Sequence, residues 1–215
     1  MTSFKEFVQE HILPIQQIGK DVLKSILEFP ISILSAPPGA GKSTWLPYYI
    51  QKELNLLNGK ILLVEPRRLA AKSVAKRLSE LYNEECGESV GYKVRFESNV
   101  SEFTKIEVVT EGVFLNYILA DNLLEGISLI IFDEFHERNL QSDLALSLSL
   151  QLQQILRSDL KILIMSATLD IDELKRVLPE ASVLKSEGRM YPVNFHYLKE
   201  EEQFLNLNLI AAHCI

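Results

Sequence analysis

Short apolar runs alternate with longer amphipathic stretches along most of this 215-residue chain. Several runs are almost continuously apolar, which is typical of strands buried on both faces of a sheet. They predict strands at residues 31–35, 61–65, 90–94, 106–110, 129–133, 162–166 and 182–184. The stretches between them, at 42–53, 69–82, 111–119 and 144–156, predict helices. This alternation predicts an α/β fold class, with a mostly parallel sheet and helices on both faces.

The two ends of the chain depart from this alternation. Residues 2–28 predict one or two amphipathic helices, broken around Pro14. Asp170 and Glu173 have the spacing of a capping box that opens a short helix. Beyond Glu180 the pattern changes, and residues 187–197 predict a connector into a new element. We therefore divide the chain into an N-terminal helical segment (1–29), a central α/β domain (30–185), and a linker with the start of a further domain (186–215).

Composition excludes several classes of protein. No run of 18 apolar residues is present, so no membrane span is expected. The N-terminus lacks the layout of a signal peptide. The two cysteines, Cys86 and Cys214, lie far apart and predict neither a metal site nor a disulfide framework. This cysteine usage suits a reducing compartment, and we expect a cytoplasmic protein.

The charge is acidic overall but locally basic. The formal net charge of −7 argues against a nucleic-acid binder that uses its whole surface. Between Lys60 and Arg77, however, six Lys or Arg residues accompany one Glu. Such a basic patch can contact phosphates, although a solvated helix face would have the same composition.

Residues 36–44 read Ala-Pro-Pro-Gly-Ala-Gly-Lys-Ser-Thr, between a predicted strand and a predicted helix. This is the context of a phosphate-binding P-loop, in which backbone N–H groups and the helix N-terminus converge on an anion. Lys42 would reach the β- and γ-phosphates of ATP, and the Ser43 hydroxyl would sit on Mg²⁺. The residues predicted to bind the nucleotide are Pro38, Gly39, Ala40, Gly41, Lys42, Ser43 and Thr44.

The first position of this loop departs from the usual pattern. It is Ala36 where glycine is usual, which is tolerable if its φ is negative. The alternative is a glycine-rich turn that contains Lys-Ser by chance.

The predicted strand at 129–133 ends in a pair of carboxylates, Asp133 and Glu134. Ligands of open α/β sheets bind at the carboxyl ends of strands. Asp133 would hold Mg²⁺ through water, and Glu134 would orient or deprotonate the attacking water. His136 would contact the nucleotide or transmit its state. The alternative for the acidic pair is a helix cap after a buried strand.

Taken together, these segments resemble the motifs of superfamily 2 helicases of the DEAH/RHA group, most closely the bacterial HrpB type. Residues 39–44 are similar to motif I and residues 133–136 to motif II, with Phe135 where the group name has Ala. Residues 66–71 and 109–112 are similar to motifs Ia and Ib, and residues 166–168 to motif III. The resemblance covers residues 15–197.

The resemblance implies that residues 30–185 form a RecA-like ATP-binding domain. It implies further that Ser166 and Thr168 couple hydrolysis to strand movement and that Arg77 stacks on the nucleotide base. Residues 188–193 are similar to the segment that joins the first RecA-like domain to the second. The residues implied to contact the nucleic-acid backbone are Arg67, Arg68, Thr110, Glu111 and Gly112.

We therefore expect the motor domain of an ATP-dependent nucleic-acid helicase, acting as a monomer on single-stranded RNA, with DNA as the alternative substrate. A different P-loop ATPase or nucleotide kinase, and a non-catalytic scaffold, are the alternatives. Only 18 residues follow Tyr197, without a Gln-rich or Arg-rich motif. We expect the second RecA-like domain to be absent from this chain, which alone would bind nucleotide but hydrolyse it poorly and unwind no duplex.

Overall fold

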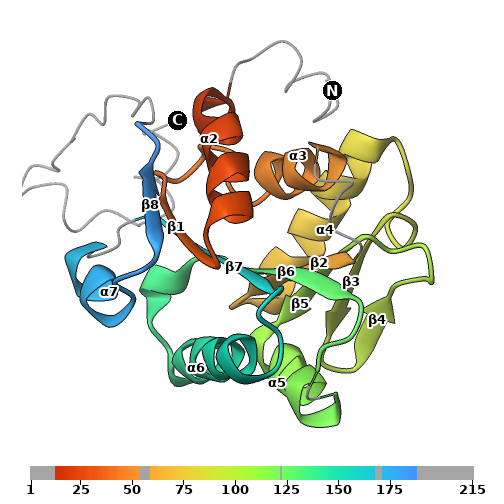
Figure 1. The fold of residues 1–215 in the computed structure, drawn as a ribbon. Helices are drawn as coiled ribbons and strands as arrows, with labels where there is room; N and C mark the ends of the chain where they lie inside the picture. Colours follow the sequence, from red (N-terminus) through yellow and green to blue (C-terminus); the bar gives the residue numbers. More distant parts are fainter. Residues whose placement is uncertain (1–12, 54–58, 122, 168–170, 188–215) are drawn as a thin grey trace, which may run out of the picture.

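An eight-stranded sheet forms the centre of the computed structural model, which describes residues 13–53, 59–121, 123–167 and 171–187 (Figure 1). The strand order is β4-β3-β5-β2-β6-β7-β1-β8, and all neighbours pair in parallel except β3 and β4. This confirms the predicted α/β class with a mostly parallel sheet. The strands are β1 (Ile31–Ser35), β2 (Lys60–Glu65), β3 (Val90–Val94), β4 (Glu97–Asn99), β5 (Ile106–Thr110), β6 (Ile127–Phe132), β7 (Lys161–Ser166) and β8 (Ser182–Lys185).

Helices cover both faces of the sheet, as Figure 1 shows. On one face lie α2 (Pro14–Glu28), α3 (Trp45–Glu53) and α4 (Arg68–Tyr82), and on the other α5 (Glu111–Ala120) and α6 (Leu140–Ile155). The short helix α7 (Ile171–Val177) lies beside β8, and a 3-10 turn, η1 (Phe135–Glu137), follows β6.

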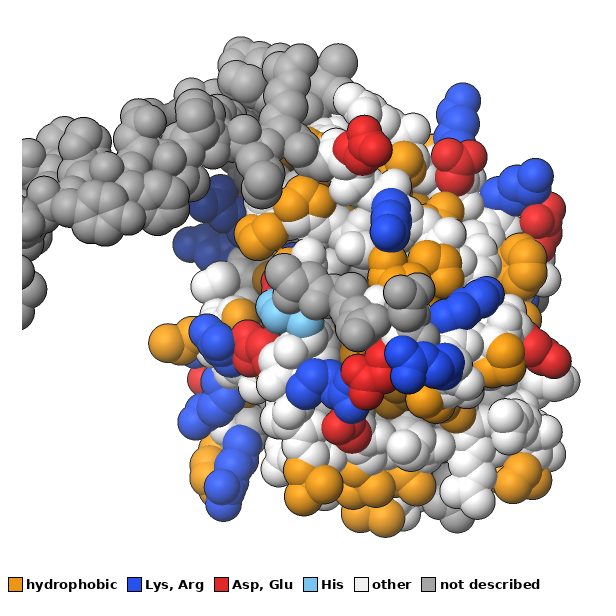
Figure 2. Space-filling view, turned by 90° about the vertical axis from the view of Figure 1, so that its left-hand side faces the viewer, with side chains coloured by type: hydrophobic (Ala, Val, Ile, Leu, Met, Phe, Trp, Pro, Cys, Tyr) orange, Lys and Arg blue, Asp and Glu red, His pale blue; other side chains and the backbone are white. Residues whose placement is uncertain are grey.

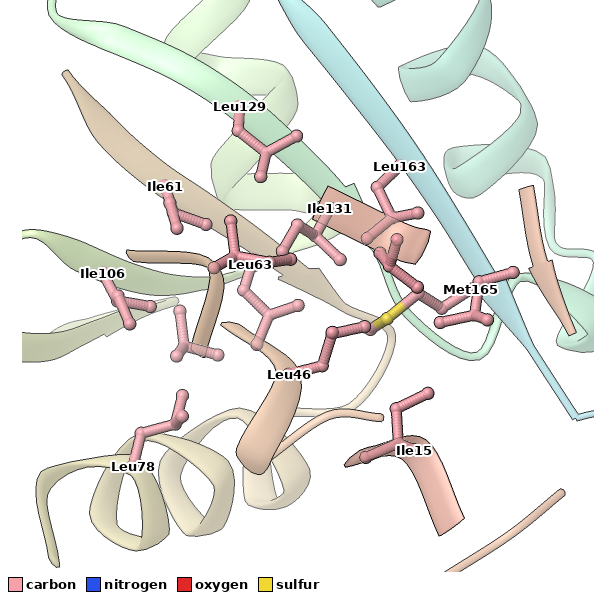
Figure 3. Packing of buried hydrophobic residues seen from close by; sticks show 14 of the residues in the cluster. Ile15, Leu46, Ile61, Leu63, Leu78, Ile106, Leu129, Ile131, Leu163 and Met165 are labelled. Carbon is pink, nitrogen blue, oxygen red and sulfur yellow. The ribbon is translucent and has the colours of Figure 1, made fainter. Parts of the chain in front are cut away.

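Two hydrophobic clusters result, because successive side chains of a strand point to opposite faces. In Figure 3, Ile15, Leu46 and Leu78 from three helices approach strand residues such as Leu63 and Ile131. Their neighbours in sequence, including Ile130 and Phe132, belong to the cluster beneath α5 and α6. There the rings of Phe114 and Phe132 meet edge to face, with centroids 5.7 Å apart, and both side chains are fully buried.

The N-terminal helix belongs to the same core as the sheet. Ile15, Val22 and Ile26 are buried on the predicted face of α2. Pro14 is the first residue of the helix rather than a break within it, a position where its missing N–H costs nothing. Residues 2–12, which were predicted to be helical, lie outside the described residues.

The phosphate-loop helix begins later than predicted. Helix α3 starts at Trp45, and the N–H groups of Trp45 and Leu46 both donate to the Gly41 carbonyl (2.9 and 3.2 Å), which ties the helix to the loop. The Trp45 ring stacks on Tyr49 at 4.5 Å between centroids. A Cβ at Gly19 of α2 would lie 3.2 Å from this indole, so the glycine lets α2 approach α3 closely.

Two further differences from the predicted elements have local causes. Helix α6 starts at Leu140, because the Asn139 side chain accepts a hydrogen bond from the Ser142 N–H (2.9 Å) and caps the helix. The edge strand β4 was not predicted. It contains three polar residues and follows Phe96, whose φ is +66°.

Strand register brings the chemically important loops to one edge. Ser35 lies opposite Ser166, Glu65 opposite Thr110, and Val64 opposite Phe132. Because these are the carboxyl ends of parallel strands, the loops after them emerge side by side. Over the described residues, every helix is too short or too polar to cross a bilayer.

Candidate functional site

The loop after β1 has the backbone that its sequence predicts. Gly39 and Gly41 have φ values of +75° and +92°, a region that disfavours residues with a Cβ. Ala36 has no positive φ, so alanine is tolerated there. Its N–H donates to the Ser166 carbonyl (2.9 Å), which ties the loop to the end of β7. A Cβ at Gly39 would meet nothing within 4 Å, so the loop is open where an anion would enter.

Helix α2 holds the other side of this loop. The Ile15 N–H donates to the Ala40 carbonyl at 3.2 Å. A Cβ at Gly41 would lie 2.8 Å from Leu13 Cδ1 and 3.2 Å from Ile15 Cγ2, so the start of α2 and the residue before it pack directly on the loop. The loop is therefore fixed from both sides, by α2 and by β7.

The loop lysine and the acidic pair after β6 form one cluster. Lys42 is buried, and its Nζ donates to Glu134 Oε1 at 2.7 Å. The Glu134 N–H donates to Asp133 Oδ1 (2.8 Å), and His136 Nδ1 lies 3.3 Å from Glu134 Oε2. The structure thus brings together all four residues predicted to be catalytic, Lys42, Asp133, Glu134 and His136.

A further carboxyl, Glu65, belongs to this cluster and was missed in the sequence. It is the last residue of β2, is buried, and lies beside the Asp133 carboxyl, with which it interacts. Burial, and then the charges of Asp133 and Glu134, raise the pKa of Glu65 to about 10. Burial also raises the pKa of Asp133, against the opposing charge of Lys42. The pair formed by Glu65 and Asp133 therefore holds a proton at neutral pH. The only signal in the sequence is one acidic residue that ends an apolar run.

The cluster has a place suited to magnesium. Asp133 Oδ2 is buried and has no hydrogen-bond partner among the described residues. The Ser43 hydroxyl is close enough to the same carboxyl to lower its pKa. Across the described part of the chain, no group of three or more His, Cys, Asp or Glu side chains could hold a metal ion. One hydroxyl and one carboxylate nevertheless fit Mg²⁺, which keeps several waters and uses phosphate oxygens as ligands.

The residues predicted to contact nucleic acid divide between two places. Arg68, Thr110, Glu111 and Gly112 line one groove of about 840 Å³. Lys93 and Arg95, which no sequence motif singles out, line the same groove. Arg67 lies just before α4, and its guanidinium pairs with Glu137 Oε1 at 2.8 Å. On the face shown in Figure 2, Lys and Arg side chains alternate with Asp and Glu rather than forming one basic field.

Glu111 also lines this groove, but its side chain is held by other residues. Its side chain is buried and accepts hydrogen bonds from Asn139 Nδ2 (2.9 Å) and from the Ser142 hydroxyl. A carboxylate would in any case repel a phosphate. Any contact of Glu111 with nucleic acid would therefore be made by its backbone N–H.

The remaining predicted site residues lie outside the cluster around Lys42 or outside the described residues. Ser166 is fully buried at the end of β7, whereas Thr168 and residues 188–193 lie outside the described residues. Arg77 lies further along α4, with its guanidinium 3.7 Å from the Glu80 carboxylate. Its role at the nucleotide base stays a prediction.

The family described as DEAD/DEAH box helicase matches residues 7–177 of this chain. The ATP-dependent RNA helicase HrpB of Escherichia coli (strain K12) is 54% identical over 186 residues, which cover 86% of this chain and 23% of that protein. The ATP-dependent RNA helicase HrpA of the same strain is 39% identical over 187 residues, which cover 86% of this chain and 14% of that protein.

Solved structures agree with the sequence relatives. A crystal structure of the Escherichia coli DEAH/RHA helicase HrpB superimposes with a TM-score of 0.85 at 51% identity. The match covers 93% of this chain and 26% of that one. A crystal structure of the E. coli DExH-box NTPase HrpB gives a TM-score of 0.81 at 52% identity, over 90% of this chain and 24% of that one. The chain thus spans about a quarter of the length of these HrpB proteins.

Proposed function

Because the chain belongs to the DEAD/DEAH box helicase family, we propose that it is the nucleotide-binding motor domain of an ATP-dependent RNA helicase. The observation that carries this proposal is the contact of Lys42 with Glu134, beside Asp133, at the carboxyl edge of the sheet. It joins a phosphate-binding cation to the group that would position water. Related proteins named as ATP-dependent RNA helicases support the choice of ATP and RNA.

Nucleotide binding would rearrange this contact. The open loop at Gly39 would offer backbone N–H groups to the β- and γ-phosphates, and Lys42 is a buried cation of the same loop. A phosphate oxygen would compete with Glu134 for the ammonium group. Once Lys42 turns to the phosphate, the Glu134 carboxylate is free to accept a hydrogen bond from the attacking water.

The neighbouring residues would support this step. Ser43 and Asp133 would hold Mg²⁺, which neutralises phosphate charge when bound. His136, 3.3 Å from Glu134 Oε2, would keep the freed carboxylate in place. The Ser166 carbonyl accepts a hydrogen bond from the Ala36 N–H. We also propose that Ser166 thereby links the phosphate loop to residues 166–168, which would couple hydrolysis to movement of the nucleic-acid strand.

RNA would bind in the groove between α4, α5 and the β3–β4 turn. Arg68, Lys93 and Arg95 supply positive charge there. The N-terminus of α5, at Glu111 and Gly112, adds backbone N–H groups directed at phosphate. Contacts of this kind hold the backbone without reading base sequence.

Two parts of the proposal concern context. We propose that α2 folds with residues 30–185, because its buried side chains belong to the core of the sheet. A cytoplasmic location and a monomeric state are also proposed, the former on the cysteine usage alone.

The proposal is tested by titrating the chain with a fluorescent ATP analogue in the presence of Mg²⁺. We expect Lys42→Ala to weaken binding by about 10- to 100-fold, the value of a lost charge-assisted hydrogen bond. The control is Lys24→Ala, which removes an exposed lysine of α2 that is 3.9 Å from Glu28. Equal affinity of the unsubstituted chain and Lys42→Ala would contradict the proposal. Phosphate release measured with single-stranded RNA tests the separate expectation that the chain alone hydrolyses ATP slowly.

A further inference from the structure

The loop after Asp133 contacts three separate parts of the proposed site through three of its residues. Glu134 Oε1 accepts from Lys42 of the phosphate loop at 2.7 Å. Glu137 Oε1 pairs with Arg67 before α4 at 2.8 Å. Asn139 Nδ2 donates to Glu111 at the start of α5, at 2.9 Å. Residues 134–139 therefore join the nucleotide loop to both segments for which we propose nucleic-acid contacts.

The backbone of this loop is held in an uncommon shape. Glu134 and Arg138 have φ values of +49° and +43°, which are costly for residues other than glycine. Phe135 is buried between them and contacts the ring of Phe132, with centroids 6.3 Å apart. Such a conformation persists only where the surrounding contacts enforce it. Loss of one of those contacts should therefore change the backbone conformation of the whole loop, residues 134–139.

Of the three contacts, the Arg67–Glu137 pair is the one that nucleic acid would remove. The Arg67 side chain is 72% exposed and that of Glu137 29%, whereas Lys42 and Glu111 are buried. A phosphate arriving from solvent can reach the Arg67 guanidinium and compete with the Glu137 carboxylate for it. An RNA phosphate would thus be a second anionic partner for Arg67, beside Glu137 of the loop.

We propose that Glu137 is a positioning residue that couples RNA binding to the nucleotide site. When phosphate takes Arg67, Glu137 is released, and the turn that carries His136 and Glu134 is free to shift against Lys42. This inference rests on the proposed function, because it requires that Lys42 meets nucleotide, and it adds Arg67 to the residues that meet RNA. By linkage, the factor by which RNA changes the affinity for nucleotide equals the factor by which nucleotide changes the affinity for RNA.

The experiment measures that factor directly. Dissociation constants of a labelled single-stranded oligouridylate are measured with the full chain, with and without a non-hydrolysable ATP analogue and Mg²⁺. Glu137→Gln removes the charge and keeps the shape of the side chain. We expect RNA affinity without nucleotide to rise about two- to five-fold, the range of a part-exposed ion pair. The ratio of the two RNA affinities should fall toward one.

Two further variants make the result interpretable. Glu28→Gln removes the same charge from an exposed site at the end of α2 and should leave both constants unchanged. Glu137→Asp keeps the charge but shortens the side chain. It should change RNA affinity in the same direction as Glu137→Gln, but by a smaller factor. Thermal unfolding checks that each variant folds, and Glu137→Asp carries the test if Glu137→Gln does not.

The outcomes separate the two proposals. If the unsubstituted chain binds neither RNA nor the analogue, the proposed function fails. If it binds both and Glu137→Gln shows the same RNA affinity and the same ratio, the role of Glu137 is overturned. Weaker RNA binding by Glu137→Gln would also overturn it, because the ion pair would then hold Arg67 ready for RNA rather than withhold it.

Discussion

The buried carboxyl of Glu65 should make the stability of this domain depend on pH in an unusual direction. In the folded chain its pKa is raised to about 10, mainly by burial and then by the charges of Asp133 and Glu134, with Lys42 opposing. In the unfolded chain the carboxyl ionises near its ordinary value of 4.5. Folding between these two values therefore takes up a proton, so the free energy of unfolding falls as pH rises.

The size of the effect follows from one proton. A difference of one bound proton changes the free energy of unfolding by about 1.4 kcal/mol for each pH unit. Between pH 6 and pH 8, Glu65 should thus lower the free energy of unfolding by about 3 kcal/mol. Glu65→Gln cannot titrate, yet its amide can still donate a hydrogen bond to Asp133. The free energy of unfolding of the variant, relative to that of the unsubstituted chain, should therefore increase by about 1.4 kcal/mol for each unit by which pH rises.

Urea unfolding followed by circular dichroism at three pH values from about 6 to 8 measures this difference. Nucleotide is omitted and a chelator removes divalent cations, which would otherwise bind at Asp133. Glu28→Gln, at an exposed carboxyl, should follow the unsubstituted chain at every pH. Parallel pH dependence of Glu65→Gln and the unsubstituted chain would refute the reasoning, since it would mean that Glu65 is ionised in the folded state.

Two other substitutions test the core and the phosphate loop. Phe114→Ala removes a fully buried ring in contact with Phe132 and should lower the free energy of unfolding by about 3–5 kcal/mol, measured by urea unfolding; a loss below 1 kcal/mol would contradict the packing described. Gly41→Ala places a Cβ 2.8 Å from Leu13 Cδ1 at a φ of +92°, and should destabilise the domain by about 1–3 kcal/mol. Gly39→Ala, at a similar φ but in open space, is its control, and equal losses would argue against the contact with α2.

Much of the fold was predictable because its strands are buried on both faces. Their apolar runs stand out, and all seven predicted strands overlap the observed ones. Strand β4 was missed because it is an exposed edge with the polar sequence Glu97-Ser98-Asn99, which has no apolar run to detect.

The site was predictable to the extent that its chemistry lies at strand ends. Lys42 and Asp133 could be assigned to one edge because parallel strands share their carboxyl ends. The partnerships of Glu65, Glu111 and Glu137 could not, since each depends on which strands are neighbours. A carboxylate looks the same in sequence whether it meets RNA, caps a helix or holds a proton.

The start of α3 also has a spectroscopic consequence. Trp45 is the only tryptophan of the chain, and it directly follows the phosphate loop, stacked on Tyr49 and close to Gly19. An indole changes its emission when its packing or its exposure to water changes. Any rearrangement of residues 36–44 that moves α3 should therefore change the fluorescence emission of Trp45. The domain carries its own unlabelled reporter of loop conformation, read out in a cuvette without attaching a dye.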